Sequence, residues 1–149
     1  MAVLMIVEVP GGTIDMYDQL NQEMGVGADN LPEGCLSHTA AFSDEGVIVA
    51  DVWESAEAFQ RFAEQQLGPA AQKTGLPPIE PRVHPVHNRL DGKGTSADTL
   101  VVIEVPGMTT ADYDTMAAAM PSHQNNDHAA VSHTVARTDD GIIVVDIWG

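Results

Sequence analysis

The sequence predicts an α+β protein in which one strand-helix-strand-strand motif occurs twice and the two antiparallel sheets pack face to face. Three observations support this fold class. One block of sequence recurs later in the chain, which is the signature of an internal repeat. Short β-branched segments alternate with segments of helical periodicity. The chain has 149 residues, of which 44% are hydrophobic, and this is enough for a real core.

The repeat is visible in three matched blocks. They are VEVPG at 7–11 with IEVPG at 103–107, SHT at 37–39 with SHT at 132–134, and DVW at 51–53 with DIW at 146–148. The offset is 96 residues for the first block and 95 for the later ones, so one deletion aligns the two copies. Ten of the seventeen positions from Ser37 to Trp53 are identical to their counterparts.

Each copy opens with a strand, continues with a helix and ends in a hairpin. The apolar runs at 3–9 and 100–105, each closed by Pro-Gly, are typical of buried strands. Thr13 and Thr109 are expected to cap the following helices. Apolar runs on both sides of Asp-Glu-Gly at 44–46 and Asp-Asp-Gly at 139–141 indicate hairpins.

Only the first copy continues beyond its hairpin. Ser55 is a candidate cap for a further helix, which Gly68-Pro69 should kink or interrupt. The stretch 79–90 is then expected to form a last strand, and the polar, glycine-containing stretch 91–97 a linker. The predicted organisation is a β-α-β-β-α-β unit at 1–90, the linker at 91–97 and a partial β-α-β-β unit at 98–149.

Composition excludes several classes of function. The chain has 22 acidic and 6 basic residues, a net charge of −16, which opposes binding to nucleic acid or to an anionic membrane. With Cys35 as its single cysteine it has no internal disulfide and no thiolate zinc cage, so we expect a cytoplasmic protein. Nucleotide-binding loops and a hydrolase nucleophile elbow are absent from the sequence. We therefore expect no cofactor and no metal.

The hairpin register decides which side chains share a face of the sheet. Asp-Glu-Gly favours a type I turn with Gly46 in a G1 bulge, which places Thr39 on the same face as Asp51 and Trp53. Because this face is half polar, we expect it to line a cavity between the two sheets. The expected ligand-contacting and orienting residues are Trp53, Trp148, Thr39, Thr134, Asp51 and Asp146. Alternatively, the tryptophans are core residues and the aspartates bond hydroxyls or backbone.

The histidines are the candidate proton acceptors. In the alternative register without a bulge, His38 lies opposite Asp51 and His133 opposite Asp146, and each carboxylate could orient its imidazole for general-base work. His87 is a third candidate base, and the neighbouring Asn88 could hydrogen-bond a ligand or simply end its strand. The spacing of His123, His128 and His133 matches no metal-binding motif.

The stretch VWESAEAF at 52–59, which follows a hairpin and opens a helix, resembles the antibiotic-biosynthesis monooxygenase-like family of dimeric α/β barrels. This resemblance implies ferredoxin-like units paired sheet to sheet, and Trp53 as a residue that lines the cavity. The family also includes haem-degrading enzymes with an iron-ligating histidine in the second helix. Here the corresponding turn is FQRFA at 59–63, so the resemblance does not imply haem ligation.

The expected function is that of a small-molecule enzyme of the monooxygenase-like type: a cofactor-independent oxygenase, a cyclase or an isomerase. Its substrate would be an apolar, aromatic or polyketide-like molecule. The alternative is a protein of the same fold that only holds a ligand, or whose cavity is filled by its own side chains. Since the second copy lacks a helix and a strand, we also expect a homo-oligomer, most simply a dimer.

Overall fold

The computed structural model describes residues 1–27, 30–76, 79–92, 97–120 and 130–148. It is an α+β structure that divides into two compact units, Met1–Val83 and His84–Gly149. This boundary differs from the one expected at 90, because the strand predicted at 79–90 is counted largely with the second unit. The stretch 93–96 of the predicted linker lies outside the described residues.

Unit 1 has an antiparallel sheet of three strands in the order β2-β3-β1. The strands are β1 (Val3–Pro10), β2 (Cys35–Ser43) and β3 (Gly46–Trp53). Strand β1 pairs with β3 along its whole length, from Val3 opposite Trp53 to Pro10 opposite Gly46. The predicted strand and hairpin of the first copy therefore form one sheet.

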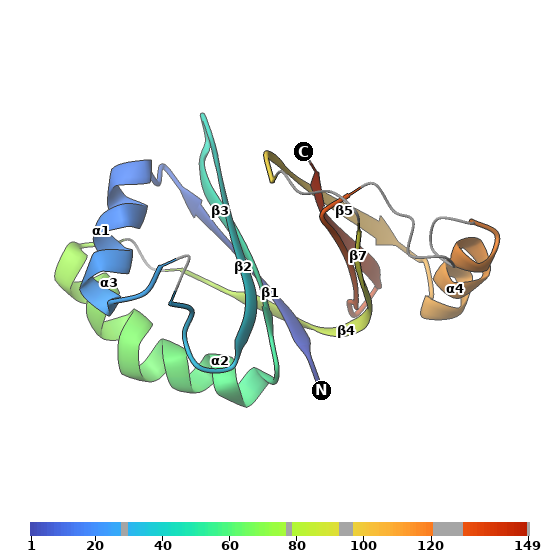
Figure 1. Ribbon diagram of the computed structural model, residues 1–149, viewed down its shortest axis with the longest axis horizontal. Helices are drawn as coiled ribbons and strands as arrows, with labels where there is room; N and C mark the ends of the chain where they lie inside the picture. The colour runs from blue at the N-terminus through green and yellow to red at the C-terminus, as the bar shows by residue number, and fades with distance from the viewer. Residues whose placement is uncertain (28–29, 77–78, 93–96, 121–129, 149) are drawn as a thin grey trace. The chain divides into compact units, whose positions relative to one another are not determined.

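Three helical segments cover one face of this sheet, as Figure 1 shows. Helix α1 (Ile14–Met24) begins at Thr13, whose hydroxyl accepts a hydrogen bond from the Met16 backbone N–H, as predicted. Helix α2 (Ala56–Phe62) begins at Ser55, which caps it in the same way through the N–H of Ala58. A π-helical turn, η1 (Ala63–Leu67), then joins α2 to α3 (Gly68–Thr74).

The π-helical turn is how the chain accommodates Gly68-Pro69 without ending the helix. The N–H of Gly68 bonds the carbonyl of Ala63, five residues earlier. The wider turn absorbs the proline, which lacks an N–H and would clash with the carbonyl of a regular α-helix. The predicted interruption is thus a local change of helix type.

Among the described residues, no helix is long and apolar enough to span a membrane.

The core of unit 1 lies between the sheet and these helices. Alternate residues of β1 and β3 face the helices, and Trp53 at the end of β3 is fully buried among them. Its indole ring lies 5.4 Å from the ring of Phe59 and 5.3 Å from that of Phe62, centroid to centroid. Aromatic contacts of this kind add to the stabilisation that burial provides.

Unit 2 has a four-stranded antiparallel sheet in the order β4-β6-β7-β5. The strands are β4 (Arg82–Asp91), β5 (Thr99–Pro106), β6 (Ser132–Arg137) and β7 (Gly141–Trp148). Helix α4 (Thr110–Ala118) begins at Thr109 with a capping box, in which Thr109 and Asp112 each bond the other's backbone N–H. Its Tyr113 packs against Val135 and Ile142 of the sheet.

The hairpin registers correct one prediction. In unit 1, Ser43 pairs with Gly46 and His38 with Asp51, so the loop holds only two residues and the expected G1 bulge is absent. In unit 2, His133 likewise pairs with Asp146. The register without a bulge is therefore the observed one, and it turns each histidine to the same face as its aspartate.

Candidate functional site

Tyr17, His38 and Asp51 form a row of hydrogen-bonded side chains on the helix-covered face of the unit 1 sheet, and Trp53 bonds the end of this row. His38 Nδ1 lies 2.6 Å from Asp51 Oδ1, and His38 Nε2 lies 2.5 Å from the hydroxyl oxygen of Tyr17. Trp53 Nε1 donates to the second carboxylate oxygen of Asp51 at 3.3 Å. The carboxylate is thus held on both oxygens, and the imidazole on both nitrogens.

Three elements bring these residues together. The β2–β3 register places His38 directly opposite Asp51. The Thr13 cap starts α1 so that Tyr17 lies one turn into the helix, where its ring stacks on that of His38 with an interplanar angle of 6°. Opposed residues of an antiparallel pair are close enough for a direct side-chain contact. The contact therefore follows from register and capping.

This row borders a partly enclosed cavity of about 100 Å³ between the sheet and the helices of unit 1. Most of the lining is apolar, with aliphatic residues from β1, β3 and α1 and aromatic residues from β3 and α2. Its polar lining side chains among the described residues are Thr13, Tyr17, Asn21, Cys35, His38, Asp51 and the indole of Trp53. None of the described lining residues is a lysine or arginine.

Burial shifts the protonation of two groups at this cavity. Burial raises the pKa of the Tyr17 hydroxyl, a hydrogen bond from Asn21 opposes this shift, and the charges of Asp51 and Asp18 add to it. Burial, reinforced by the charge of Asp51, raises the pKa of the Cys35 thiol to about 12. Cys35 is therefore a protonated, unreactive part of the wall rather than a nucleophile.

Unit 2 contains the same row of side chains. Tyr113 bonds His133 Nε2 at 2.7 Å, and His133 Nδ1 lies 2.6 Å from Asp146 Oδ1. Here the tyrosine is only 1% exposed, and its hydroxyl also accepts a hydrogen bond of 3.5 Å from Asn88. The tyrosine of the second row is therefore buried, and its hydroxyl bonds side chains of its own unit.

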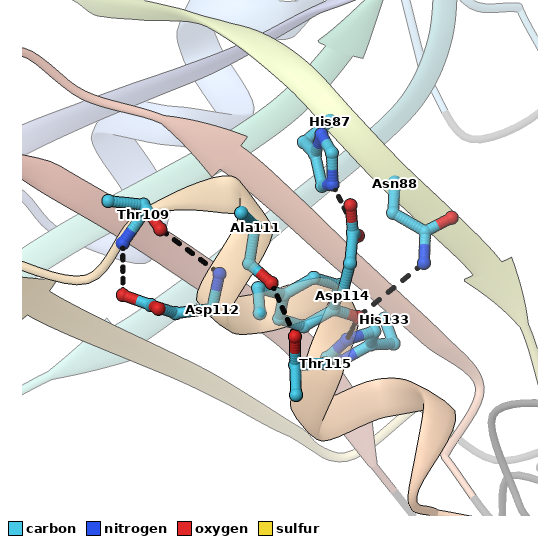
Figure 2. A network of polar contacts seen from close by, with 9 residues as sticks. His87, Asn88, Thr109, Ala111, Asp112, Asp114, Thr115 and His133 are labelled. Carbon is cyan, nitrogen blue, oxygen red and sulfur yellow. Dashed lines mark hydrogen bonds and ion pairs between the residues drawn. The ribbon is translucent and has the colours of Figure 1, made fainter.

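His87 and Asn88 both face helix α4, as Figure 2 shows. Neighbouring residues of a strand normally face opposite sides, but β4 shifts register between Val86 and Asn88, and this bulge lets both side chains reach the helix. His87 Nε2 lies 2.7 Å from Asp114 Oδ1. His87 and Asn88 therefore tie β4 to α4.

The structure also corrects the expected roles of several predicted residues. Trp53 was expected at a cavity between the two sheets, and it lines a cavity inside unit 1, between its own sheet and helices. Thr39 pairs with Ala50 and Thr134 with Val145, so both threonines point to the sheet face opposite the histidines. Thr39 is accordingly not among the residues that line the cavity. Trp148 is half-buried, on the strand face that carries Asp146.

Tyr17 and Tyr113 were not among the residues expected at the site, although both hydrogen-bond a histidine there. A signal was present, since these are the two tyrosines of the whole sequence and they recur at the offset of the repeat. His123 and His128 lie outside the described residues. Within the described ranges, no group of three or more His, Cys, Asp or Glu side chains is placed to hold a metal ion.

Comparison with solved structures identifies the fold. Two bacterial proteins, each described as a "putative monooxygenase", superpose on 99% of this chain. The one from Lactobacillus acidophilus NCFM is 12% identical, with a TM-score of 0.68 over 76% of its length. The one from Fusobacterium nucleatum subsp. nucleatum is 11% identical, with a TM-score of 0.69 over 75% of its length. An anthrone oxidase-like protein is 19% identical, with a TM-score of 0.53 over 72% of its length.

The chain therefore has the fold of these monooxygenase-like proteins, as the resemblance at 52–59 predicted. The identities are low, so the likeness is one of fold. No family model matches the sequence, and no curated protein matches it.

Proposed function

We propose that this protein is a small-molecule enzyme of the monooxygenase-like type that works in the cavity of unit 1 without a cofactor. One observation carries the proposal: a histidine held by a carboxylate borders a mostly apolar cavity. A positioned base of this kind can take a proton from a bound substrate, and that step can begin a cofactor-independent oxygenation, an isomerisation or a cyclisation.

His38 is the proposed base and Asp51 the group that orients it. A carboxylate that accepts the Nδ1 proton leaves the lone pair on Nε2, which is the nitrogen directed away from Asp51. The imidazolium formed on proton transfer is then paired with a carboxylate that is only 5% exposed. The same carboxylate cannot rotate freely because Trp53 holds its other oxygen.

The cavity volume limits the substrate. An apolar cavity of roughly 150 Å³ holds one benzene molecule, so a cavity of about 100 Å³ that is only partly enclosed favours a small ligand of no more than about one ring. A ligand of this size is smaller than the polyketide-like polycycle that the sequence left open. The aromatic rings of Trp53, Phe59 and Phe62 offer surfaces that favour an apolar or aromatic ligand.

The two copies differ in a way that favours unit 1 as the site. His38 is 28% exposed, whereas His133 is 8% exposed beneath a buried tyrosine. We assign a structural role to four residues whose hydrogen bonds stabilise unit 2: His133, Asp146, His87 and Asn88. The face-to-face packing of the sheets, a homodimer and a cytoplasmic location remain parts of the proposal that rest on the sequence.

The proposal is tested by oxygen uptake and product analysis with one-ring aromatic compounds, under air and under nitrogen. The wild type should convert at least one of them, and His38→Gln should lower kcat by about 10²- to 10⁴-fold. His133→Gln, the same change in unit 2, should keep the turnover per folded molecule. Loss of turnover only with His133→Gln would move the site to unit 2. A ligand that binds in the cavity without conversion by the wild type would favour the alternative, a binding protein of the same fold.

A further inference from the structure

The lone pair of His38 that should meet a substrate is already occupied. Its Nε2 lies 2.5 Å from the Tyr17 hydroxyl, and the two rings are stacked. A substrate can therefore reach this nitrogen only by displacing Tyr17 or by passing its proton through the Tyr17 hydroxyl. Tyr17 itself lines the cavity, so the second route needs no rearrangement.

The direction of each hydrogen bond follows from Asp51 when His38 is neutral, the form in which it acts as a base. The ionised carboxylate oxygen can only accept, so the neutral imidazole donates from Nδ1 and accepts at Nε2. Tyr17 then donates its one proton to Nε2, and its oxygen has only lone pairs left. Asn21, one helical turn along α1, also lines the cavity and opposes the rise in the pKa of this hydroxyl. A lone pair remains on the oxygen, and the complementary ligand group is a hydrogen-bond donor.

The charges around the cavity select against an anionic ligand. Asp51 lines the cavity, and the described lining residues include no lysine or arginine to pair with a carboxylate or phosphate. Moving an unpaired anion from water into apolar surroundings costs several kcal/mol. A neutral hydroxyl has no such cost, and it supplies the donor that Tyr17 lacks.

We propose that Tyr17 is the catalytic residue that touches the substrate, and that the substrate is a neutral, compact apolar molecule carrying a hydroxyl group. This inference rests on the proposed function and adds the path of the proton. The substrate O–H bond breaks as its proton passes to the Tyr17 oxygen, while the proton of Tyr17 passes to His38 Nε2. The products are a substrate anion and an imidazolium that lies between Asp51 and the Tyr17 hydroxyl. The anion therefore forms close to a positive charge, and charge and atoms balance without an oxidant.

The test is binding of three related probes, measured by isothermal titration calorimetry at pH 7. They are 4-cyanophenol, benzonitrile, which lacks the hydroxyl, and 4-cyanobenzoate, which is an anion. The wild type should bind the phenol about two- to tenfold more tightly than benzonitrile, the worth of one hydrogen bond, and the benzoate most weakly. Tyr17→Phe should bind the phenol and benzonitrile equally. Tyr113→Phe is the matched control in unit 2 and should keep the wild-type preference.

Equal binding of phenol and benzonitrile by the wild type overturns the inference, as does an unchanged preference in Tyr17→Phe or tighter binding of the benzoate. Circular dichroism of each variant separates lost preference from lost fold. The proposed function fails separately. If the preference depends on Tyr17 but no neutral hydroxylated compound is converted, the ligand class stands and the enzymatic proposal falls.

Discussion

Replacing Asp51 by asparagine should reverse the hydrogen bonding of His38. The carboxylate accepts from both His38 Nδ1, at 2.6 Å, and Trp53 Nε1, at 3.3 Å. An asparagine side chain has almost the same shape but offers one acceptor oxygen and one donor nitrogen. It cannot accept from both rings, so one of the two bonds must change.

The two possible orientations of the new amide group differ in free energy. If the amide oxygen faces His38, the amide nitrogen faces the indole N–H of Trp53, which is fully buried and left unpaired at a cost of about 1–3 kcal/mol. If the amide is flipped, it accepts from the indole and donates to His38 Nδ1, and the imidazole proton moves to Nε2. Tyr17 can then accept instead of donating, so both imidazole nitrogens and the indole N–H stay paired. The flipped arrangement should dominate by about 5- to 150-fold.

The assay is long-range ¹H–¹⁵N NMR of the His38 ring, which distinguishes a protonated from an unprotonated nitrogen. In the wild type the proton should be on Nδ1, and in Asp51→Asn on Nε2, where it removes the proposed base and should lower kcat about 10²- to 10⁴-fold. Asp114→Asn, which changes the exposed partner of His87, should leave the His38 spectrum unchanged. A wild-type ring protonated on Nε2, or an unchanged tautomer in Asp51→Asn, would refute the reasoning.

Three further predictions concern stability. In urea denaturation, Tyr113→Phe should lower the free energy of unfolding by about 1–3 kcal/mol and Tyr17→Phe by about 0.5–1.5 kcal/mol. The loss should be larger for Tyr113 because it is 1% exposed and bonded to two side chains. Equal losses of stability in the two variants would contradict this. Gly46→Ala should lower the free energy of unfolding by about 2 kcal/mol or more, because a Cβ there would lie 2.2 Å from the Val9 carbonyl oxygen. A Cβ at Gly25 meets nothing within 4 Å, so Gly25→Ala should lower it by only about 1 kcal/mol. If Gly46→Ala loses no more stability than Gly25→Ala, the close approach of Gly46 to the Val9 carbonyl is contradicted. Burial raises the pKa of both tyrosines, so the unfolded chain releases protons first and the free energy of unfolding should fall as pH rises above about 10. Absorbance titration of folded and urea-unfolded protein checks this, and identical phenolate curves would disprove it.

Local sequence signals predicted the elements well. Thr13 and Ser55 cap their helices because a hydroxyl at that position satisfies a free backbone N–H, an effect confined to a few neighbouring residues. The effect of Gly68-Pro69 was also predicted, although the form it takes, a π-helical turn, was not. The offset between the two copies predicted where the second hairpin lies once the first was recognised.

The hairpin register could not be predicted from its own loop. Gly46 was interpreted as the left-handed residue of a bulge, but its φ is +141° and it lies against the carbonyl of Val9 on β1. Gly141 approaches Val105 in the same way. Glycine is needed there because a third strand comes close, and that requirement comes from residues far away in the sequence.

The site was predicted in part for the same reason. Once the register is fixed, the pairing of His38 with Asp51 follows, and the sequence contained this pairing as its alternative. The place of Tyr17 depends on how α1 packs over the sheet, which no local pattern encodes. The cavity likewise depends on which face the helices cover, and Trp53 therefore contacts the helices of its own unit.

Diffraction from a crystal grown with 4-cyanophenol would test most directly where the ligand binds and which atom receives it. The account predicts one molecule in the cavity of unit 1, with its hydroxyl oxygen about 3 Å from that of Tyr17 and its ring against Trp53 or the phenylalanines of α2. A phenol bound elsewhere, or one whose hydroxyl points away from Tyr17, would contradict it.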